Sequence, residues 1–303
     1  MKQRGVMMMH KPKVTVIGSI NMDMVTATSR IPGKGETLIG EGFNMVPGGK
    51  GANQAVAAAR LGADVNLIGR VGDDHFGEIL TEQLVKERVS VTGVEPVTGE
   101  SSGVATILLA EQDNRIMVTP GANNHVTPEY VARYTSIIKE SDIVLLQLEI
   151  PLQTVEYVTG YCNQEGIPVI LNPAPAQLLS DSLLSNVSYV TPNETEALEI
   201  TENIAGFEDK MIVTLGEAGV RYKLDQKEVI VPGFPVNPVD TTGAGDTFNG
   251  ALAVAFAKGE EMEQAISYAN AAAALSVLHF GAQGGMPDAT AVKNFLNERK
   301  TAE

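Results

Sequence analysis

The sequence predicts an α/β fold in which a doubly wound, mostly parallel sheet is flanked by helices and carries a small β-sheet lid. Short runs rich in β-branched residues show little alternation with polar residues, which is typical of parallel strands buried on both faces. Helix patterns separate these runs along the chain, as they do in doubly wound domains. Two stretches break the alternation and contain no helix pattern, which indicates a second β element.

The expected strands are apolar runs bounded by glycine, proline or asparagine. The first is "KVTVIGSI", and the others lie at residues 63–72, 141–149, 166–173, 187–193 and 210–216. The expected helices lie at residues 51–62, 75–89, 127–141, 151–166, 193–201, 246–259, 261–278 and 288–300. We therefore expect a single domain over residues 14–303, preceded by a flexible leader at residues 1–13.

The two stretches without helix pattern predict the lid. Residues 21–46 have period-two character with Gly and Pro turns, and "SSGVATILLAEQDNRIMVTPGAN" predicts a hairpin that turns at Asp113 and Asn114. Insertions near strand ends often carry substrate contacts, so we expect a lid formed by about residues 22–46 and 101–120. The alternative is an ordinary extension of the sheet edge.

Composition limits the function. The chain has 303 residues, with 22 Lys and Arg against 37 Asp and Glu, so its net charge is −15. Such a surface repels nucleic acids and anionic membranes. No apolar run approaches the roughly 18 residues of a membrane span. The single cysteine, Cys162, is expected to be structural, and its being alone fits a reducing cytoplasm.

Polar residues follow the first expected strand and a glycine-rich turn. Asn21 and Asp23, in "GSINMD", point to the same side of an extended chain and could bind hydroxyl groups together. In "PGGKGANQA", glycines such as Gly49 allow close backbone approach, and Lys50 and Asn53 can face one site at a helix start. Neither a Walker P-loop nor the G-x-G-x-x-G dinucleotide fingerprint is present, which disfavours a nicotinamide dehydrogenase.

Two further motifs each have two interpretations, and a third gives a weaker signal. Glu149 ends an expected buried strand and is either a partner of a helix N-terminus or a ligand contact. Asn193 and Glu196 form either a capping box or a loose magnesium site near phosphates. The turn from Thr214 to Gly219 is suited to pass beneath a nucleotide.

The most informative segment is Gly243-Ala244-Gly245-Asp246. Glycines at a helix start allow several N–H groups to converge, and the helix dipole adds positive charge, so the turn predicts an anion site. Asp246 alone could simply cap the helix. Two glycines before a carboxylate instead suit phosphoryl transfer, with amides that stabilise the transferred group and a base that takes the proton of the attacking hydroxyl.

These segments, together with "TPNETEA" and "DTTGAGDTFNGAL", resemble the signature stretches of the ribokinase-type (phosphofructokinase-B) carbohydrate kinases. The resemblance runs in order from about Val14 to the last expected helix. "GSINMD" and "GGKGANQA" are more similar to the ribokinases than to the fructose, adenosine or ketodeoxygluconate kinases of this family.

The resemblance implies that ATP phosphorylates the terminal hydroxyl of D-ribose, giving ribose 5-phosphate, with Asp246 as base and Gly243, Ala244 and Gly245 as anion hole. The implied sugar contacts are Asn21, Asp23, Gly49, Lys50, Asn53, Glu149 and Asp246. The implied ATP contacts are Asn193, Thr214, Leu215, Gly216, Glu217, Ala218, Gly219, Gly245 and Asn270. Magnesium would be held through water by Glu196, and a monovalent cation, usually potassium, by Asp240, Thr242, Ser276, His279, Gly281 and Gly285. The lid would also form a homodimer interface.

The chain departs from the family pattern in two places. Gly285 lies where ribokinases often have a serine that binds potassium. The segment "TENIAGFED" is also short, because the family normally has a further helix before the strand at residues 210–216. Two alternatives stay open: a kinase of the same fold that acts on deoxyribose, another sugar or a nucleoside, and a sugar-binding protein with impaired catalysis.

Overall fold

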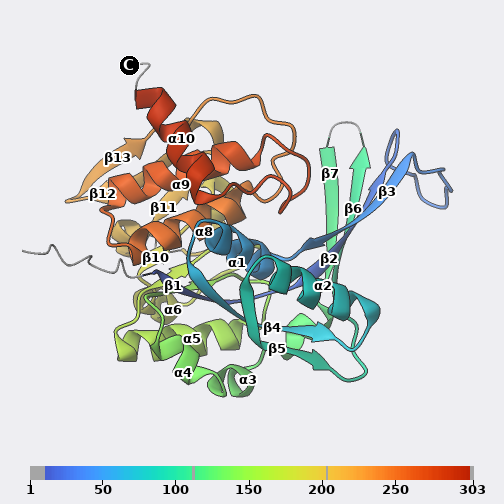
Figure 1. The fold of residues 1–303 in the computed structure, drawn as a ribbon, viewed down its shortest axis with the longest axis horizontal. Coiled ribbons are helices and arrows are strands. Elements are labelled where there is room, and N and C mark those ends of the chain that lie inside the picture. The colour runs from blue at the N-terminus through green and yellow to red at the C-terminus, as the bar shows by residue number, and fades with distance from the viewer. Residues whose placement is uncertain (1–10, 111–112, 203, 301–303) are drawn as a thin grey trace, which may run out of the picture.

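The computed structural model describes residues 11–110, 113–202 and 204–300. Most of the expected leader therefore lies outside the described residues. Within them, the molecule has a central sheet covered by helices and a second sheet that projects from one side (Figure 1). The predicted fold class is confirmed.

The central sheet is parallel throughout, in the order β10-β9-β8-β1-β4-β5. Its strands are β1 (Lys13–Ile17), β4 (Asp64–Gly72), β5 (Val89–Val97), β8 (Ile143–Leu146), β9 (Val169–Leu171) and β10 (Tyr189–Val190). The inner strands β8 and β9 are buried at every position, as expected for apolar runs without alternation. The carboxyl ends of these parallel strands lie at one edge, where ligands of such sheets bind.

One strand of the central sheet was missed. The helix expected over residues 75–89 ends early, because α2 spans His75–Lys86 and Glu87 caps it. Arg88 then adopts a φ of 64°, which turns the chain so that Val89 begins β5 and pairs with Val65 of β4. The last residue of the expected helix is therefore the first residue of an edge strand.

A three-stranded antiparallel sheet continues the central sheet beyond β10. It contains β11 (Ile212–Thr214), β12 (Val220–Leu224) and β13 (Lys227–Val231), and Met211, just before β11, bridges Val190 of β10 in parallel fashion. The connection from β10 to β11 consists of α7 (Glu194–Glu199) and two short 3₁₀ turns at Ile204–Gly206 and Glu208–Lys210. The short segment noted in the sequence thus still spans the crossover.

Helices cover both faces of the sheet, and the two cores alternate along each strand. On one face, Val14, Val16 and Leu145 pack with α1 (Lys50–Arg60), α8 (Ala244–Ala257) and α9 (Met262–Ser276). On the other, Ile17 and Leu146 pack with α3 (Pro128–Ala132), α4 (Thr135–Lys139), α5 (Leu152–Glu165) and α6 (Asp181–Asn186). Figure 1 shows these two layers, with α10 (Ala289–Lys300) over α9.

Two details of the helix predictions were wrong. The helix expected over residues 127–141 is broken at Tyr134 into α3 and α4, and α6 was not predicted.

Cys162 lies buried on α5, where burial raises the pKa of its thiol to about 12, as expected for a structural residue. No helix in the described ranges combines the length and the apolar character that crossing a membrane would need.

The projecting sheet is the lid. Its order is β3-β2-β6-β7, with β2 (Asn21–Ala27) antiparallel to β3 (Gly42–Gly48) and parallel to β6 (Gly103–Ala110). The hairpin of β6 and β7 (Asp113–Thr119) is present, but its turn was misplaced. Asp113 pairs with Ala110 and Asn114 with Leu109, so the turn precedes both residues, and its own residues lie outside the described ones.

Close backbone packing fixes α1 above the end of β1. A Cβ at Gly51 would lie 2.6 Å from the backbone of Gly18 and Ser19, so no larger residue fits. The N–H of Ala52 donates to the carbonyl of Ser19 at 2.9 Å. This contact sets the place of the first turn of α1, which carries the site residues Lys50 and Asn53.

We expect Gly51→Ala to lower the free energy of unfolding by about 2–3 kcal/mol, because backbone atoms must move to accept the methyl group. Gly160→Ala is the matched control, since Gly160 lies inside α5 and its added Cβ would meet nothing closer than 4.0 Å. That change should stabilise the protein by up to about 1 kcal/mol through helix propensity. Urea unfolding measures both, and equal effects of the two substitutions would contradict the packing of α1 described above.

Candidate active site

A cavity of about 700 Å³ lies between the lid and the carboxyl-end edge of the central sheet. Its lining comes from β2, the start of α1, the loop after β8, the lid strands β6 and β7, and the start of α8. All of the expected sugar contacts line it: Asn21, Asp23, Gly49, Lys50, Asn53, Glu149 and Asp246. The structure thus brings together residues that are up to about two hundred positions apart in the sequence, and their roles remain predictions.

Asp246 is buried in the first turn of α8 and does not cap its own helix. The N-cap is Gly243, which has a φ of 79° and lies so close to Ala282 that a Cβ would be 2.8 Å from its Cα. The two carboxylate oxygens of Asp246 instead accept hydrogen bonds from Asn53 Nδ2 (2.9 Å) and Gln54 Nε2 (3.1 Å). Burial raises the pKa of Asp246, while Lys50 and these two amides oppose the shift.

The turn before Asp246 presents the positive end of α8 to the same place. N–H groups in the first turn of a helix have no partner within the helix, and the macrodipole adds to their positive charge. The carbonyls of this turn face other partners, since Thr247 Oγ1 donates to the carbonyl of Gly243 (2.9 Å) and Asn249 Nδ2 to that of Gly245 (2.8 Å). One N–H is already engaged, because Ala244 donates to the carbonyl of Thr241 at 3.2 Å. The arrangement can hold an anion beside a buried carboxylate.

The cavity concentrates carboxylates around one lysine. Burial raises the pKa of Asp23 to about 7, and the nearby Glu149 and Asp246 add to the shift. For Lys50, burial disfavours the charged form, but Asp246, Glu149, Glu196 and Asp23 outweigh it and raise the pKa. The lysine therefore stays protonated and is the positive charge on which the surrounding carboxylates depend.

Several polar residues that support this cavity were not predicted. Gln54 donates to Asn172 Oδ1 (3.1 Å) as well as to Asp246, and it accepts from Gln147 Nε2 (2.6 Å). Asn123 Nδ2 donates to Asn21 Oδ1 (2.7 Å) and so orients that side chain. The only signal for Gln54 was a polar residue among alanines in a helix pattern. Asn123 gave none, because its partners are about a hundred positions away.

The structure resolves the two ambiguous acidic positions in part. Glu149 Oε2 accepts the N–H of Lys50 at 3.2 Å, so it serves the N-terminus of α1 and also lines the cavity. Asn193 and Glu196 form a reciprocal capping box, with both hydrogen bonds at 2.8 Å. The capping interpretation is therefore confirmed, while the magnesium role of Glu196, which also lines the cavity, stays a prediction.

A second cavity of about 250 Å³ adjoins Ala244 at the start of α8. Of the expected nucleotide contacts, Gly216, Glu217 and Asn270 line it. Asn270 is held by a hydrogen bond from its Nδ2 to the carbonyl of Pro232 (3.1 Å). The other expected contacts do not line it: Asn193 at the start of α7, Thr214 at the end of β11, Leu215, Ala218 and Gly219 in the following turn, and Gly245 in the first turn of α8.

The residues of the expected cation site lie on the loop before α8 (Asp240 and Thr242), at the end of α9 (Ser276) and in the loop after it (His279, Gly281 and Gly285). Asp240 Oδ1 accepts from Thr242 N–H (2.9 Å) and Oγ1 (2.7 Å), and its Oδ2 accepts the N–H of Gly281 (2.9 Å). Burial opposes ionisation of Asp240, but these hydrogen bonds lower its pKa below the ordinary value. His279 is exposed, and no cluster of three or more His, Cys, Asp or Glu side chains suited to a metal occurs in the part of the chain that the structure describes.

Gly285 has a steric explanation. A Cβ at this position would lie 1.9 Å from the carbonyl oxygen of Ser276, so a serine could not be accommodated without movement of the backbone. The loop after α9 thus passes closer to the end of that helix than a side chain at Gly285 permits.

Comparison with known proteins agrees with this geometry. The sequence matches the family profile described as pfkB family carbohydrate kinase over residues 11–289. A ribokinase of Bacillus subtilis (strain 168) is 51% identical over 290 residues, covering 94% of this chain and 99% of that protein. A deoxyribokinase of Salmonella typhi is 38% identical over 302 residues, covering 94% and 98%. A structure of Arabidopsis thaliana ribokinase complexed with ribose and ATP superposes with a TM-score of 0.87 at 33% identity, covering 95% of this chain and 99% of that one. The chain therefore belongs to the pfkB family of carbohydrate kinases.

Proposed function

We propose that this kinase transfers the γ-phosphoryl group of ATP to the terminal hydroxyl of D-ribose, giving ribose 5-phosphate. The observation that carries the proposal is the buried carboxylate of Asp246, which lines the cavity of about 700 Å³ and lies in the first turn of α8 at once. Its relatives support the substrate, because the Bacillus protein is a ribokinase and the Arabidopsis structure holds ribose and ATP.

Asp246 would act as the general base. Burial favours proton uptake by its carboxylate, and a base is most effective when its pKa approaches the working pH. Asn53 and Gln54 hold both carboxylate oxygens and leave room for a hydroxyl donor, since each oxygen has more than one lone pair. The terminal hydroxyl of the sugar would give its proton to Asp246 as its oxygen bonds to the γ-phosphorus, while the bond from that phosphorus to the bridging oxygen breaks and ADP leaves.

The start of α8 would stabilise the transferred group. The phosphoryl oxygens would accept hydrogen bonds from the N–H groups of the Gly243–Gly245 turn, which also lies at the positive end of the helix dipole. Lys50 would balance the negative charge that phosphate adds to a cavity already containing Asp23 and Glu149. A protein with a net charge of −15 would in this way bind a polyanion through local donors.

Magnesium fits the cavity by donor chemistry. Oxygen ligands suit this ion, and it commonly keeps several waters, so a single loosely placed carboxylate suffices. Glu196 uses only Oε2 in its capping box and lines the cavity. When bound, magnesium would neutralise charge on the phosphates of ATP.

A monovalent cation fits the loop that contains Asp240. This carboxylate ties Thr242 to Gly281, and oxygen ligands of the type found there suit hard cations. The remaining ligands would be backbone carbonyls near Ser276, His279 and Gly281, with no side-chain oxygen at Gly285. Such an ion would hold the turn before α8 in shape, because Thr242 directly precedes Gly243.

Deoxyribose is the second candidate substrate, favoured by the Salmonella deoxyribokinase among the relatives. A nucleoside is less suitable, because the described residues that line the cavity include no aromatic ring on which a base could stack. Discrimination between ribose and deoxyribose would depend on the carboxylates and amides around the sugar, since a hydrogen-bonding site is left unpaired by an analogue without the hydroxyl.

The lid would also pair with a second copy of the chain. Its outer strands β3 and β7 are sheet edges, and the strands of the lid expose three large apolar side chains that do not line the cavity: Phe43, Met45 and Met117. Exposed apolar surface of this kind is typical of protein interfaces.

Asp246→Asn should lower kcat with D-ribose by about 10²- to 10⁴-fold, because the base is lost while the shape of the cavity is kept. The assay is ADP release from ATP and magnesium with D-ribose, 2-deoxyribose, fructose or adenosine, each with sodium or potassium. Ribose should be the best acceptor, and potassium should raise its turnover. Calorimetry should show that Asp246→Asn still binds ribose.

Turnover with another sugar would overturn the substrate and keep the mechanism. Full activity of Asp246→Asn would overturn the role of Asp246. A folded parent protein that binds ribose and transfers no phosphate would make the chain a sugar-binding protein.

Asp23→Asn should weaken ribose binding and yet stabilise the protein by about 1–3 kcal/mol at pH 8. The pKa of Asp23 rises from 3.8 to about 7 on folding, so the folded state holds this proton more tightly than the unfolded state. Asp23 therefore costs stability progressively between about pH 4 and pH 7, and the asparagine variant avoids that cost. The measurement is urea unfolding of parent and variant across this range.

Asp74→Asn is the control with the opposite sign. Burial opposes the charge of Asp74, but hydrogen bonds from Ser102 and Gly77 lower its pKa below the ordinary value. Its loss should destabilise the protein more at pH 7 than at pH 3. A variant of Asp23 whose stability relative to the parent does not change with pH would contradict the charged cavity described above.

Sedimentation should show a dimer for the parent at micromolar concentration and a monomer for Met45→Glu, which places a charge on the exposed face of the lid. Leu224→Glu is the matched control, since Leu224 is similarly exposed on β12, outside the lid. A monomeric parent, or dissociation by both substitutions alike, would overturn the lid interface.

A further inference from the structure

The loop between α9 and α10 contacts both halves of the active site. Ala282 packs against Gly243, so that no side chain fits at the N-cap of α8. The neighbouring Gln283 is buried, and its Nε2 donates to Asn53 Oδ1 at 3.0 Å. One short segment therefore borders the turn expected to hold phosphate and also touches the amide that binds Asp246.

Asp246 and Gln283 together fix which way the amide of Asn53 points, because an ionised carboxylate can only accept and Gln283 Nε2 donates. Because Asn53 Oδ1 accepts from Gln283, its Nδ2 is left to donate to Asp246 at 2.9 Å. A reversed amide would place its carbonyl oxygen against the carboxylate and its NH₂ against another NH₂. Asn53 is buried, with 5% of the residue exposed.

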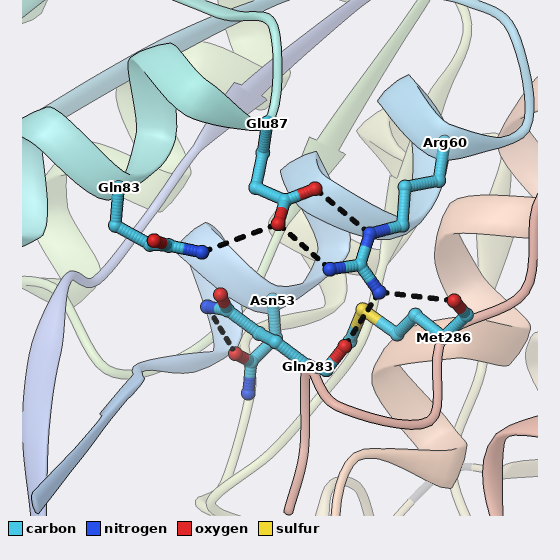
Figure 2. Close-up of polar contacts among 6 residues, drawn as sticks. All are labelled: Asn53, Arg60, Gln83, Glu87, Gln283 and Met286. Carbon is cyan, nitrogen blue, oxygen red and sulfur yellow. Dashed lines mark hydrogen bonds and ion pairs between the residues drawn. The ribbon is translucent and has the colours of Figure 1, made fainter.

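Arg60 ties this loop to α1. Its Nη1 donates to the carbonyls of Gln283 (2.6 Å) and Met286 (3.0 Å), as Figure 2 shows. Arg60 is the last residue of α1, and Asn53 lies two turns earlier on the same helix. The loop is thus held to α1 at two points, by its backbone at Arg60 and by the Gln283 side chain at Asn53.

Glu87 and Gln83 orient Arg60 in turn. Glu87 accepts from Arg60 Nε (2.8 Å) and Nη2 (2.7 Å), and Gln83 Nε2 donates to Glu87 at 3.2 Å (Figure 2). The side chains of Arg60 and Glu87 are only 25% and 17% exposed, so water screens this pair less than a surface ion pair. Because the guanidinium group is planar, pairing of Nε and Nη2 with Glu87 aims Nη1 at the carbonyls of Gln283 and Met286. A lysine could not contact both Glu87 and these carbonyls.

We propose that Arg60 is a positioning residue for the phosphoryl-transfer step, and that it acts through Gln283 and Asn53 on the orientation of Asp246. The proposal rests on the proposed function, because it takes Asp246 as the base. Arg60 contacts neither cavity directly, and neither cavity is lined by Gln283. Loss of Arg60 should therefore impair catalysis through the placement of groups that it does not touch.

The test is steady-state kinetics of ATP-dependent ribose phosphorylation by Arg60→Lys, Gln283→Met and the double variant. Arg60→Lys keeps the charge and loses the fork, and Gln283→Met keeps the shape and loses the donor. Each should lower kcat about 10- to 100-fold, the size expected when a reacting group is misplaced by a fraction of an ångström to an ångström. KM for ribose should stay within about threefold, because the other sugar contacts are unchanged.

The double variant separates positioning from general loss of structure. If Arg60 acts through Gln283, the second substitution should add less than about threefold to the loss in kcat, whereas independent effects would multiply. Arg133→Lys is the matched control, since Arg133, the C-cap of α3, makes a comparable fork with Glu95 of β5 (2.9 and 2.6 Å) and lines neither cavity. It should leave kcat unchanged.

Losses in kcat that multiply in the double variant would overturn the inference. An unchanged kcat in a folded Gln283→Met would also overturn it, even if Arg60→Lys proved too unstable to assay. A parent protein with no turnover would instead overturn the proposed function. A parent that turns over normally beside variants with parental kcat would overturn only the role of Arg60.

Discussion

The hydrogen bonds that hold the buried carboxylate of Asp246 to the first turns of α1 set the geometry of the site. Asn53 and Gln54 donate to its two oxygens, so α1 and α8 are joined at their N-termini above the carboxyl ends of the sheet. A carboxylate at this depth is costly unless it is hydrogen-bonded or paired. The amides and Lys50 reduce that cost without removing the rise in its pKa, and a base needs that rise.

The fold brings these helix starts together. In a parallel sheet every strand ends at the same edge, so the segments after β1 and β8 and the start of α1 meet without long loops. Close backbone contacts then take the place of side chains: Gly51 lies on the β1 end and Gly243 on Ala282. Beyond these, a buried chain of polar groups runs from Gln54 through Asn172 to Thr191, and Thr191 donates to Asn249 at 2.6 Å. Asn249 in turn holds the carbonyl of Gly245, so the base and the phosphate-binding turn share one network.

Sequence reasoning reached the parts of this site that depend on local chemistry. Glycine turns, strand ends and the carboxylate after Gly245 can be recognised within a few residues. It missed β5, because this edge strand is buried only at Val89 and Gly93 and follows a helix without a glycine or proline break. It also missed Arg60 and Gln283, which are 223 positions apart where they meet. Nothing in either local pattern marks such a pair, since tertiary packing alone brings them together.

The most direct test of this account is the crystal structure of the protein with D-ribose and a non-hydrolysable ATP analogue. We expect the terminal hydroxyl oxygen of the sugar to lie about 2.6–3.2 Å from a carboxylate oxygen of Asp246. We also expect the terminal phosphate to contact N–H groups of the Gly243–Gly245 turn. A terminal hydroxyl hydrogen-bonded to Asp23 or Glu149 instead, with Asp246 shielded behind Asn53 and Gln54, would contradict the role of Asp246 as the base.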